Sequence, residues 1–423
     1  MTFRGVRRRL PLLLVIVAAS CLGCRTSSPP VAPSPSTVEQ APSVPGSPAG
    51  AGSPRPSVGV PSPSAAVVPT TAAGCPERML GSMTEPQRIG QLFMVGLASD
   101  RLGAPELAGI ASDHFGSVWL TTQTSEGVAR ARAVADAVQA QATQSATGGV
   151  RFFVAANQEG GLIQALSGPG FSQVPSALDQ GSLAPSALQA AARGWGSQLR
   201  SAGINLDFAP VADVVPAGTD ALNAPIGQLR REFGHDPATV RSHVVAFIDG
   251  MDQAGIATTV KHFPGLGRVV GNTDFAAAVS DHVTTRNDPS LDPFAAALEA
   301  GVPFVMVSLA TYDRIDPAHL AVFSPAVIGD MLRGDLQYAG VVVSDDLGAA
   351  EAVASIPQAI RAVDFLDAGG DMIISKTLGP ATAMAQAITL LAASDDGFRA
   401  RVDDAALRIL RAKGAAGLLP CRG

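Results

Sequence analysis

The sequence predicts a (β/α)8 barrel, a closed ring of parallel strands with a helix following each strand. Eight short apolar runs recur along the chain, and longer segments rich in Ala, Leu and Arg separate them. Most of the runs are continuous rather than alternating, as in parallel strands that are covered on both faces. Alternation of strand and helix favours a parallel sheet, and eight repeats favour closure of that sheet into a barrel.

The eight expected strands share this apolar, uninterrupted character. They are Phe93–Gly96, Ser117–Leu120, Phe152–Ala156, Ile204–Pro210, Thr258–His262, Phe304–Ser308, Gly340–Asp345 and Asp371–Ser375. An open doubly wound sheet is the alternative architecture, but it would normally carry a Gly-rich phosphate loop after its first strand. The sequence has none there, so a barrel is favoured.

The segments between these runs have helical composition, and several begin with proline, which is favoured in the first helical turn. The clearest are Pro185–Ala202, Pro237–Ala254, Pro325–Arg333 and Ile356–Ala368. The folded part is long for one core but normal for a barrel of this type with insertions. We therefore expect a single catalytic domain over residues 75–423.

Residues 1–24 have the plan of a secretory signal, with a basic start, a short apolar core and a small residue before the break. Four arginines precede the apolar run Leu10–Gly23, which is shorter than the roughly 20 residues of a transmembrane helix. Leu22-Gly23-Cys24 resembles the bacterial lipobox, in which the cysteine is lipidated; Cys21 is the alternative lipidation site. A plain cleaved signal is the other interpretation.

Residues 25–74 are dominated by Pro, Ser, Ala, Val and Gly, with almost no charged or aromatic residues. Such a segment cannot bury enough apolar surface to offset its ordering entropy, so we expect a disordered linker. Together with the signal, it predicts an exported protein held by an N-terminal lipid anchor at the outer face of the cytoplasmic membrane, or a protein of the cell wall space.

Two further cysteines, Cys75 and Cys421, bracket the folded part. In an oxidising compartment the simple interpretation is one disulfide that joins the two ends. Neither these cysteines nor the six histidines have the spacing of a metal site, so no metal and no cofactor are expected.

The 30 basic and 36 acidic residues give a net charge of −6, and outside the signal the basic residues do not cluster. A nucleic-acid partner would require a basic face, so none is expected. We expect a monomer.

Polar residues fall at or just beyond the ends of several expected strands. Asn157, Asp213, Lys261, His262 and Asp345 all occupy such positions. Because the carboxyl ends of barrel strands form the active-site face, these side chains are expected to converge at one rim. Any one of these residues could be a helix cap or a hydrogen-bonded polar group of the core. Such structural roles explain less well why all of them occur at the same ends of the strands.

Three motifs at these positions carry a resemblance to a known family. Asn157-Gln158-Glu159-Gly160-Gly161, Val260-Lys261-His262-Phe263-Pro264-Gly265 and Val343-Ser344-Asp345-Asp346-Leu347 resemble glycoside hydrolase family 3, most closely its bacterial β-N-acetylglucosaminidase branch, which acts on peptidoglycan fragments. The resemblance spans nearly all of residues 80–415 and implies a single-domain, lipoprotein-type β-hexosaminidase.

The resemblance implies a role for Asp345 as the nucleophile of a retaining glycosidase, forming a covalent glycosyl-enzyme that water hydrolyses. Lys261 and His262 match residues that bind sugar hydroxyls, and Arg231 matches an arginine that contacts the sugar. Asn157 stands where the family usually has a sugar-binding aspartate, and an amide can still donate and accept. Asp346 is expected to be structural, because successive side chains on a strand point to opposite faces.

One departure concerns the general acid/base. The branch carries an Asp-Ser-His in the loop after Lys-His-Phe-Pro-Gly, whereas this loop places Asn272 at the aspartate and Asp274 at the histidine. A carboxyl group can protonate a leaving oxygen and later activate water if its environment raises its pKa. Asp274 is therefore the first candidate for the acid/base, and His282, which follows Asp281, is the second. Glycines in the loop would suit a mobile segment that delivers the acid.

The predicted function is removal of terminal β-linked N-acetylglucosamine from cell-wall fragments. Transfer of the sugar to phosphate and a β-glucosidase are variants of the same chemistry. A sugar-binding lipoprotein with impaired catalysis is the alternative from another class, favoured by the altered loop, by Asn157 and by Leu162, where the family has arginine. The retained Asp345 counts against it, because an unpaired buried carboxylate is costly in a binding site.

Overall fold

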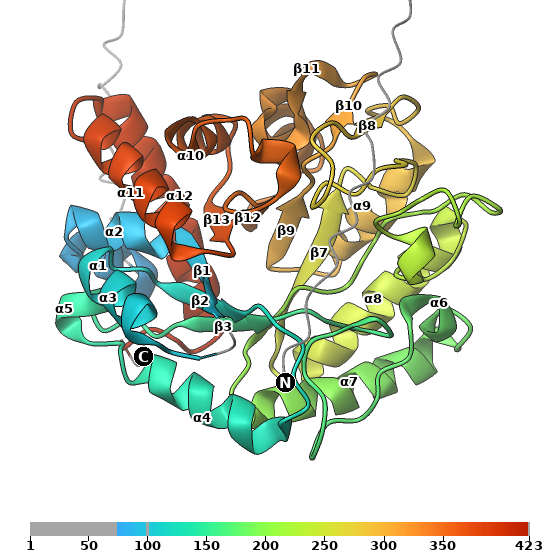
Figure 1. Ribbon diagram of the computed structural model, residues 1–423, viewed down its shortest axis with the longest axis horizontal. Coiled ribbons are helices and arrows are strands. Elements are labelled where there is room, and N and C mark those ends of the chain that lie inside the picture. Colours follow the sequence, from blue (N-terminus) through green and yellow to red (C-terminus); the bar gives the residue numbers. More distant parts are fainter. Residues whose placement is uncertain (1–73, 99–100, 422–423) are drawn as a thin grey trace, which may run out of the picture. The chain divides into compact units, whose positions relative to one another are not determined.

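The computed structural model describes residues 74–98 and 101–421, which form one compact unit. Figure 1 shows strands at its centre and helices around them. The signal segment with Cys21 and Cys24, and all but the last residue of the linker 25–74, lie outside the described residues. In the part that is described, no helix combines the length and the apolarity needed to cross a bilayer.

Eight parallel strands close into the predicted (β/α)8 barrel. Their order around the ring is β1, β13, β12, β9, β7, β6, β3 and β2, with β2 pairing back to β1. The strands are β1 Phe93–Leu97, β2 Ser117–Leu120, β3 Phe153–Ala156, β6 Leu206–Asp207, β7 Ala257–Phe263, β9 Phe304–Val307, β12 Val341–Asp346 and β13 Met372–Ser375. Each of the eight expected runs supplies one strand, so the fold prediction is confirmed.

The helices cover the outside of the ring, and their apolar faces pack against the strands. The longer ones are α4 Gly127–Gln139, α7 Pro185–Ser201, α8 Pro237–Gln253, α10 Gln358–Asp367, α11 Leu378–Ala392 and α12 Asp396–Ala415. Helix α8 illustrates the local signals: Pro237 opens it, and the Asp236 carboxylate accepts a 2.9 Å hydrogen bond from the Thr239 N–H. The expected helix at Pro325–Arg333 is present as a π-helix, Ala326–Asp335.

The shorter helices are α1 Cys75–Ser82, α2 Glu85–Gln91, α3 Ala104–Ser112, α5 Gln144–Thr147, α6 Ala177–Gln180 and α9 Asp292–Glu299. Two small sheets are built from the loops. β4 Gln158–Gly160 pairs with β5 Ile163–Gln164, and β10 Thr311–Tyr312 lies between β8 Ser280–Asp281 and β11 Asp316–Leu320. Both sheets follow barrel strands at their carboxyl ends, so they shape the face on which the polar residues gather.

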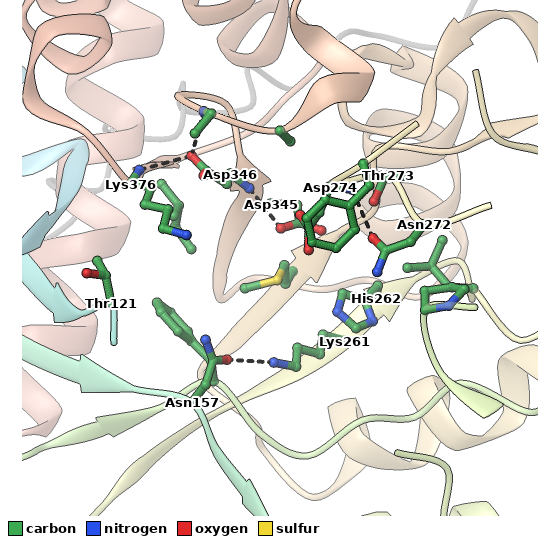
Figure 2. Close-up of a pocket in the computed structure, with 18 of the residues that line it drawn as sticks. Thr121, Asn157, Lys261, His262, Asn272, Thr273, Asp274, Asp345, Asp346 and Lys376 are labelled. Atoms are coloured by element: carbon green, nitrogen blue, oxygen red, sulfur yellow. Dashed lines mark hydrogen bonds between the residues drawn. The ribbon is translucent and has the colours of Figure 1, made fainter. Parts of the chain in front are cut away.

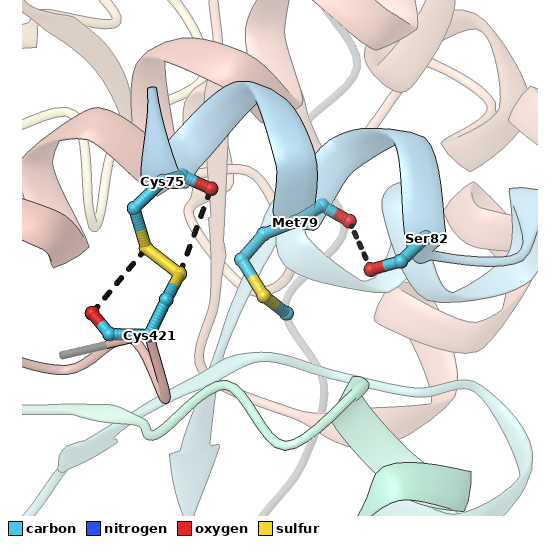
Figure 3. Close-up of a disulfide and its surroundings, with 4 residues drawn as sticks. All are labelled: Cys75, Met79, Ser82 and Cys421. Carbon is cyan, nitrogen blue, oxygen red and sulfur yellow. Dashed lines mark hydrogen bonds between the residues drawn. A yellow bond between two sulfur atoms is a disulfide. The ribbon is translucent and has the colours of Figure 1, made fainter. Parts of the chain in front are cut away.

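The two ends of the described chain meet at the opposite face of the barrel. Cys75 in α1 and Cys421 after α12 form a disulfide with their Cα atoms 6.1 Å apart (Figure 3). Leu418 accepts a hydrogen bond from the Arg151 N–H, directly before strand β3 begins. The disulfide thus lies near the amino-terminal end of a barrel strand, away from the loops at the carboxyl ends.

Candidate active site

A cavity of about 350 Å³ opens at the carboxyl ends of the barrel strands. Its lining includes the apolar side chains of Trp119, Phe208, Met306 and Ile374. Figure 2 shows the polar side chains around it, among them Asn157, Lys261 and Asp345. The site residues predicted from the sequence that line it are Asn157, Arg231, Lys261, His262, Asp274 and Asp345. Side chains that lie far apart in the sequence therefore converge on one mouth.

Glu159 pairs with two cations of this cavity, and sequence reasoning assigned it no individual role. Its carboxylate accepts two hydrogen bonds from Arg231, at 2.8 and 2.7 Å, and lies 2.6 Å from the Lys261 Nζ. Lys261 also donates to the Asn157 Oδ1 at 2.9 Å, and Arg231 donates to the Pro225 carbonyl at 2.8 Å. Two buried cations share one carboxylate, and both remain beside the cavity.

The charges in this cluster are strongly coupled. Burial alone would raise the pKa of Glu159, but the charges of Arg231 and Lys261 outweigh it and lower that pKa from 4.5 to about 2. Glu159 is therefore ionised over the whole physiological range. Removing the carboxylate would leave two buried positive charges without their compensating partner.

Asp213 fixes the orientation of His262. One Asp213 oxygen lies 2.8 Å from the His262 Nδ1, and the other accepts hydrogen bonds from the backbone N–H groups of His262 and Leu266. The Nδ1–H therefore donates to Asp213, which leaves Nε2 as an acceptor 3.4 Å from the Arg231 guanidinium. The carboxylate holds the imidazole in the tautomer whose free nitrogen faces the cavity. The Lys261–His262 peptide bond is cis, and both side chains line the cavity.

Asp345 is the second-last residue of strand β12, and its side chain lines the cavity. One of its oxygens accepts a 2.8 Å hydrogen bond from the Asp346 N–H. Burial raises the pKa of Asp345, and the negative charge of Asp274 raises it further. A partly desolvated carboxylate with few hydrogen bonds is more nucleophilic than a solvated one, provided that it is ionised.

Asp346 is occupied by the backbone around it. Its Oδ1 accepts hydrogen bonds from the N–H groups of Gly348, Lys376 and Ala349, at 2.8, 3.0 and 3.2 Å. These bonds tie the end of β12 to the segment after β13 (Figure 2). The Asp346 side chain lines the cavity, but its Oδ1 accepts hydrogen bonds from the backbone of the surrounding loops.

The loop after β7 carries Asp274 to the edge of the cavity. Asp274 is exposed, and its N–H donates to the Asn272 Oδ1 at 2.9 Å. The flanking backbone is held from the other side, because Thr273 and Asp274 accept hydrogen bonds from the N–H groups of Ala352 and Glu351. The loop places a carboxyl group next to Asp345.

The glycines of this loop differ in what the backbone requires at their positions. Gly265 has a φ of +131°, a conformation that only glycine adopts readily. A Cβ at Gly267 would lie 2.0 Å from the Val214 carbonyl oxygen, so this position requires close backbone approach. Gly271 has neither feature. The first half of the loop is thus fitted tightly against its neighbours.

His282, the second acid/base candidate, does not line the cavity. Its side chain is 74% exposed and lies 2.5 Å from the Asp313 carboxylate, where the chain leaves strands β8 and β10. The structure therefore brings Asp274, rather than His282, together with Asp345. Leu162 is also outside the cavity, with 62% of its surface exposed.

The fold and the site together define a class of enzyme. A carboxylate at the rim of a (β/α)8 barrel stands beside a second carboxyl group, and a cluster of donors faces the same cavity. Paired carboxyl groups around a polar cavity are the arrangement that cleaves glycosidic bonds.

The comparisons with known proteins specify the family. The model of the family described as "Glycosyl hydrolase family 3 N terminal domain" matches residues 84–412. The chain therefore belongs to glycosyl hydrolase family 3, as the sequence motifs predicted. The matched range includes every residue that we place in the cavity.

Relatives and solved structures agree with this assignment. A beta-hexosaminidase of Stenotrophomonas maltophilia (strain R551-3) is 36% identical over 52% of this chain and 66% of its own length. One of Xanthomonas oryzae pv. oryzae (strain KACC10331 / KXO85) is 31% identical over 67% of this chain and 83% of its own.

Among solved structures, the beta-N-acetylhexosaminidase of Beutenbergia cavernae DSM 12333 is 48% identical to this chain, with a TM-score of 0.77. The match covers 78% of this chain and 99% of that protein. The family 3 beta-N-acetylglucosaminidase of Paenibacillus sp. str. FPU-7 is 29% identical, with a TM-score of 0.73, over 81% and 64%. The chain is thus similar to the β-N-acetylhexosaminidase branch of the family, the branch that the motifs indicated.

Proposed function

We propose that this protein removes terminal β-linked N-acetylglucosamine from cell-wall fragments with retention of configuration, through a covalent intermediate on Asp345. The observation that carries the proposal is the placement of the Asp345 carboxylate in the same cavity as Lys261, His262 and Arg231. The names of the similar proteins, beta-hexosaminidase and beta-N-acetylhexosaminidase, support the amino-sugar specificity.

In the first step, an Asp345 oxygen bonds to the anomeric carbon while the bond to the leaving oxygen breaks. Asp274 gives its proton to that oxygen, so the released group leaves as a neutral alcohol. In the second step, Asp274 takes a proton from water, the water oxygen bonds to the anomeric carbon, and the Asp345 carboxylate is released. Two displacements at one carbon give net retention.

The donor cluster binds the sugar. Lys261 and Arg231 present N–H groups that suit hydroxyl and carbonyl oxygens, and His262 Nε2 can accept a hydroxyl proton. Asn157 already accepts a hydrogen bond from Lys261, so its amide N–H₂ is the part that remains for the sugar. Glu159 and Asp213 hold these groups in place before the sugar binds. Less conformational entropy is therefore lost on binding.

Hydrolysis of 4-nitrophenyl N-acetyl-β-D-glucosaminide by wild type and Asp345→Asn tests the activity. We expect at least about a thousandfold loss of kcat in the variant, as for removal of a covalent nucleophile. Equal turnover would contradict the assignment, and no turnover by either protein would favour the sugar-binding alternative.

Fluorinated donors test the covalent step and the sugar. A fluorinated N-acetylglucosamine donor should label the peptide that contains Asp345, and the glucose analogue should label it far more slowly. Preferred labelling by glucose would indicate a β-glucosidase. Addition of phosphate should leave the products unchanged; a sugar phosphate would indicate phosphorolysis.

We also propose that the protein is exported and anchored through Cys24, because the basic and apolar start of the chain is followed at once by a Pro- and Ser-rich tether. Metabolic labelling with a fatty-acid analogue in a bacterial host should modify the wild type and Cys21→Ser but not Cys24→Ser. Labelling lost only in Cys21→Ser would move the anchor to Cys21.

A further inference from the structure

A second cluster of polar side chains lies outside the cavity, on the segment that leads from β6 to α8. Asp220, Glu232 and His235 each point one ligand atom toward a common centre, and these atoms all lie within 4.8 Å of one another. Among the residues that the structure describes, no other three His, Cys, Asp or Glu side chains converge in this way. The proposed glycosidase chemistry uses none of them.

Glu232 is the unusual member of this cluster. It is fully buried, and neither of its carboxylate oxygens has a hydrogen-bond partner. A buried carboxylate without donors costs several kcal/mol unless something else compensates it. Other buried carboxylates have donors: Glu159 has Arg231 and Lys261, Asp213 has His262 and two backbone N–H groups, and Asp207 has the Gln158 N–H on one of its two oxygens.

Among the described residues, no Lys, Arg or His side chain forms an ion pair with Glu232, although the charge of Arg230 acts on it. The neighbouring Arg230 lies 2.6 Å from Asp179 instead, and the Asp220 Oδ1 is likewise buried without a hydrogen-bond partner. Two carboxylates that face each other without a donor are stable only if a proton or a cation lies between them.

We propose that Asp220, Glu232 and His235 form a binding site for a divalent transition-metal ion of the zinc class. An oxygen–oxygen–nitrogen donor set suits Zn²⁺, whereas Ca²⁺ and Mg²⁺ prefer oxygen ligands alone. The Asp220 Oδ1 and the His235 Nδ1 are 3.5 Å apart, close to the roughly 3.4 Å that separates two ligands about 2.1 Å from a tetrahedral zinc ion.

The site has an approach from solvent. The side chains of Asp220 and His235 are 36% and 35% exposed, while Glu232 forms the buried base. In the metal-free protein the His235 Nδ1 lies 3.2 Å from the Val215 carbonyl, to which its N–H can donate. A metal ion would replace that proton, and water would complete its coordination.

The bound ion would fasten the segment that presents Arg231. Asp220 lies before Arg231 in the chain, Glu232 follows Arg231 directly and His235 lies three residues further on, so one ion would join both ends of this segment. The backbone already approaches itself closely here, because a Cβ at Gly227 would lie 2.7 Å from the Asp220 Cα. Metal binding would therefore stabilise the folded protein and hold Arg231 against Glu159.

Calorimetric titration of the chelator-treated full chain with ZnCl₂ tests this site without any substrate, so its outcome is independent of the proposed function. We expect one ion per chain and a higher melting temperature with Zn²⁺, but not with Mg²⁺ or Ca²⁺. Glu232→Gln and His235→Ala should each weaken zinc binding by roughly tenfold or more, as expected for loss of a ligand.

Two controls separate this site from other zinc binding. His319→Ala removes an exposed histidine that also pairs with a carboxylate, Asp316 at 2.9 Å, and Asp345→Asn alters the barrel mouth. Neither should change the zinc affinity. Circular dichroism verifies folding, and Asp220→Asn, at a partly exposed position, replaces Glu232→Gln if that variant does not fold. Wild-type affinity in both Glu232→Gln and His235→Ala, or no zinc binding by the wild type, would overturn the proposal.

Discussion

At the scale of single residues, buried carboxylates hold the donor side chains of the cavity in position. Arg231 and Lys261 are 13% and 3% exposed at their side chains, and both contact Glu159. Asp213 does the same for His262. The donors that face a substrate are thus oriented before it arrives, which is how a site avoids reorganisation during reaction.

Glu159→Gln should destabilise the protein by about 3–5 kcal/mol at pH 7, because two buried cations lose their counter-charge. Since the pKa of Glu159 is lowered to about 2, the stabilising effect of its charge is complete above pH 4.5 and is lost as the pH falls toward 2. The difference in the free energy of unfolding between the variant and the wild type should shrink as the pH falls from 4.5 toward 2. Urea unfolding at several pH values measures this difference.

The matched control is Asp179→Asn, which removes the carboxylate of an exposed ion pair with Arg230. Solvent screens exposed ion pairs strongly, so this variant should unfold nearly like the wild type. An equal loss of stability in both variants would mean that burial of the Glu159 cluster has no special effect.

A second prediction concerns the coupling of the two carboxyl groups in the cavity. Burial and the charge of Asp274 both raise the pKa of Asp345, so Asp274→Asn should lower it. Asp345, the proposed nucleophile, would then stay ionised to lower pH, and the acidic limb of kcat/KM should move to lower pH. The substrate is a nitrophenyl glycoside, whose leaving group needs little acid assistance.

Asp396→Asn serves as the control for this experiment, because that carboxylate is 90% exposed and lies in α12. Its pH profile should match that of the wild type. An acidic limb that stays in place or moves upward in Asp274→Asn would show that Asp274 does not act on the nucleophile.

The sequence located most of these residues but not their pairings. Asn157, Lys261, His262 and Asp345 stand at strand ends, which the chain pattern reveals. The contact between Glu159 and Arg231 joins two loops through space, and no local pattern encodes it. One signal was available: adjacent Lys261 and His262 on an apolar strand require a buried partner, and Glu159 is the carboxylate within the first motif.

At the scale of elements, strands were predictable because burial on both faces leaves a continuous apolar run. Strand β6 covers only Leu206–Asp207 of the expected Ile204–Pro210, and beyond it the pairing with β7 continues through the Pro210 carbonyl and an isolated bridge between Val211 and Lys261. The helix expected at Pro325–Arg333 is a π-helix, a difference in hydrogen-bond register that composition does not determine.

The loops were least predictable, and Asn223 shows why. This buried side chain donates to the carbonyls of Leu266 and Val269, at 2.7 and 2.8 Å, and accepts from the N–H groups of Ile226 and Gly227. One amide thus joins the segment that carries Arg231 to the loop that carries Asp274. Such a bridge depends on two loops meeting in space.

Asn223→Ala should therefore impair both loops at once. Four buried backbone groups would lose their partner, which predicts a loss of about 2–4 kcal/mol in the free energy of unfolding. We also expect a lower kcat/KM, because Arg231 and Asp274 would be less well positioned. Gln228→Ala is the control, since its exposed amide donates only to the Ala221 carbonyl. Unchanged kinetics in Asn223→Ala would show that the bridge does not position the site.

At the scale of the whole molecule, the disulfide that stabilises the fold lies at the opposite end of the barrel from the cavity. The cavity lies at the carboxyl ends of the strands, whereas the two ends of the described chain meet near the amino-terminal end of β3. Glu77 in α1 also pairs with Arg411 in α12 at 2.9 Å, so the disulfide adds to an existing contact between the two ends of the described chain. In barrels of this type, changes on that face affect folding rather than catalysis.

The double variant Cys75→Ser/Cys421→Ser should therefore lose stability but keep its activity. The disulfide spans 346 residues, and removal of a native disulfide typically costs about 2–5 kcal/mol through greater freedom of the unfolded chain. We expect a lower midpoint in urea unfolding under oxidising conditions and an unchanged kcat/KM at 25 °C. Glu77→Gln, which breaks only the exposed ion pair, should shift the midpoint much less. Because the bond and the cavity lie at opposite ends of the strands, a fall in kcat/KM that matched the loss of stability would contradict this separation.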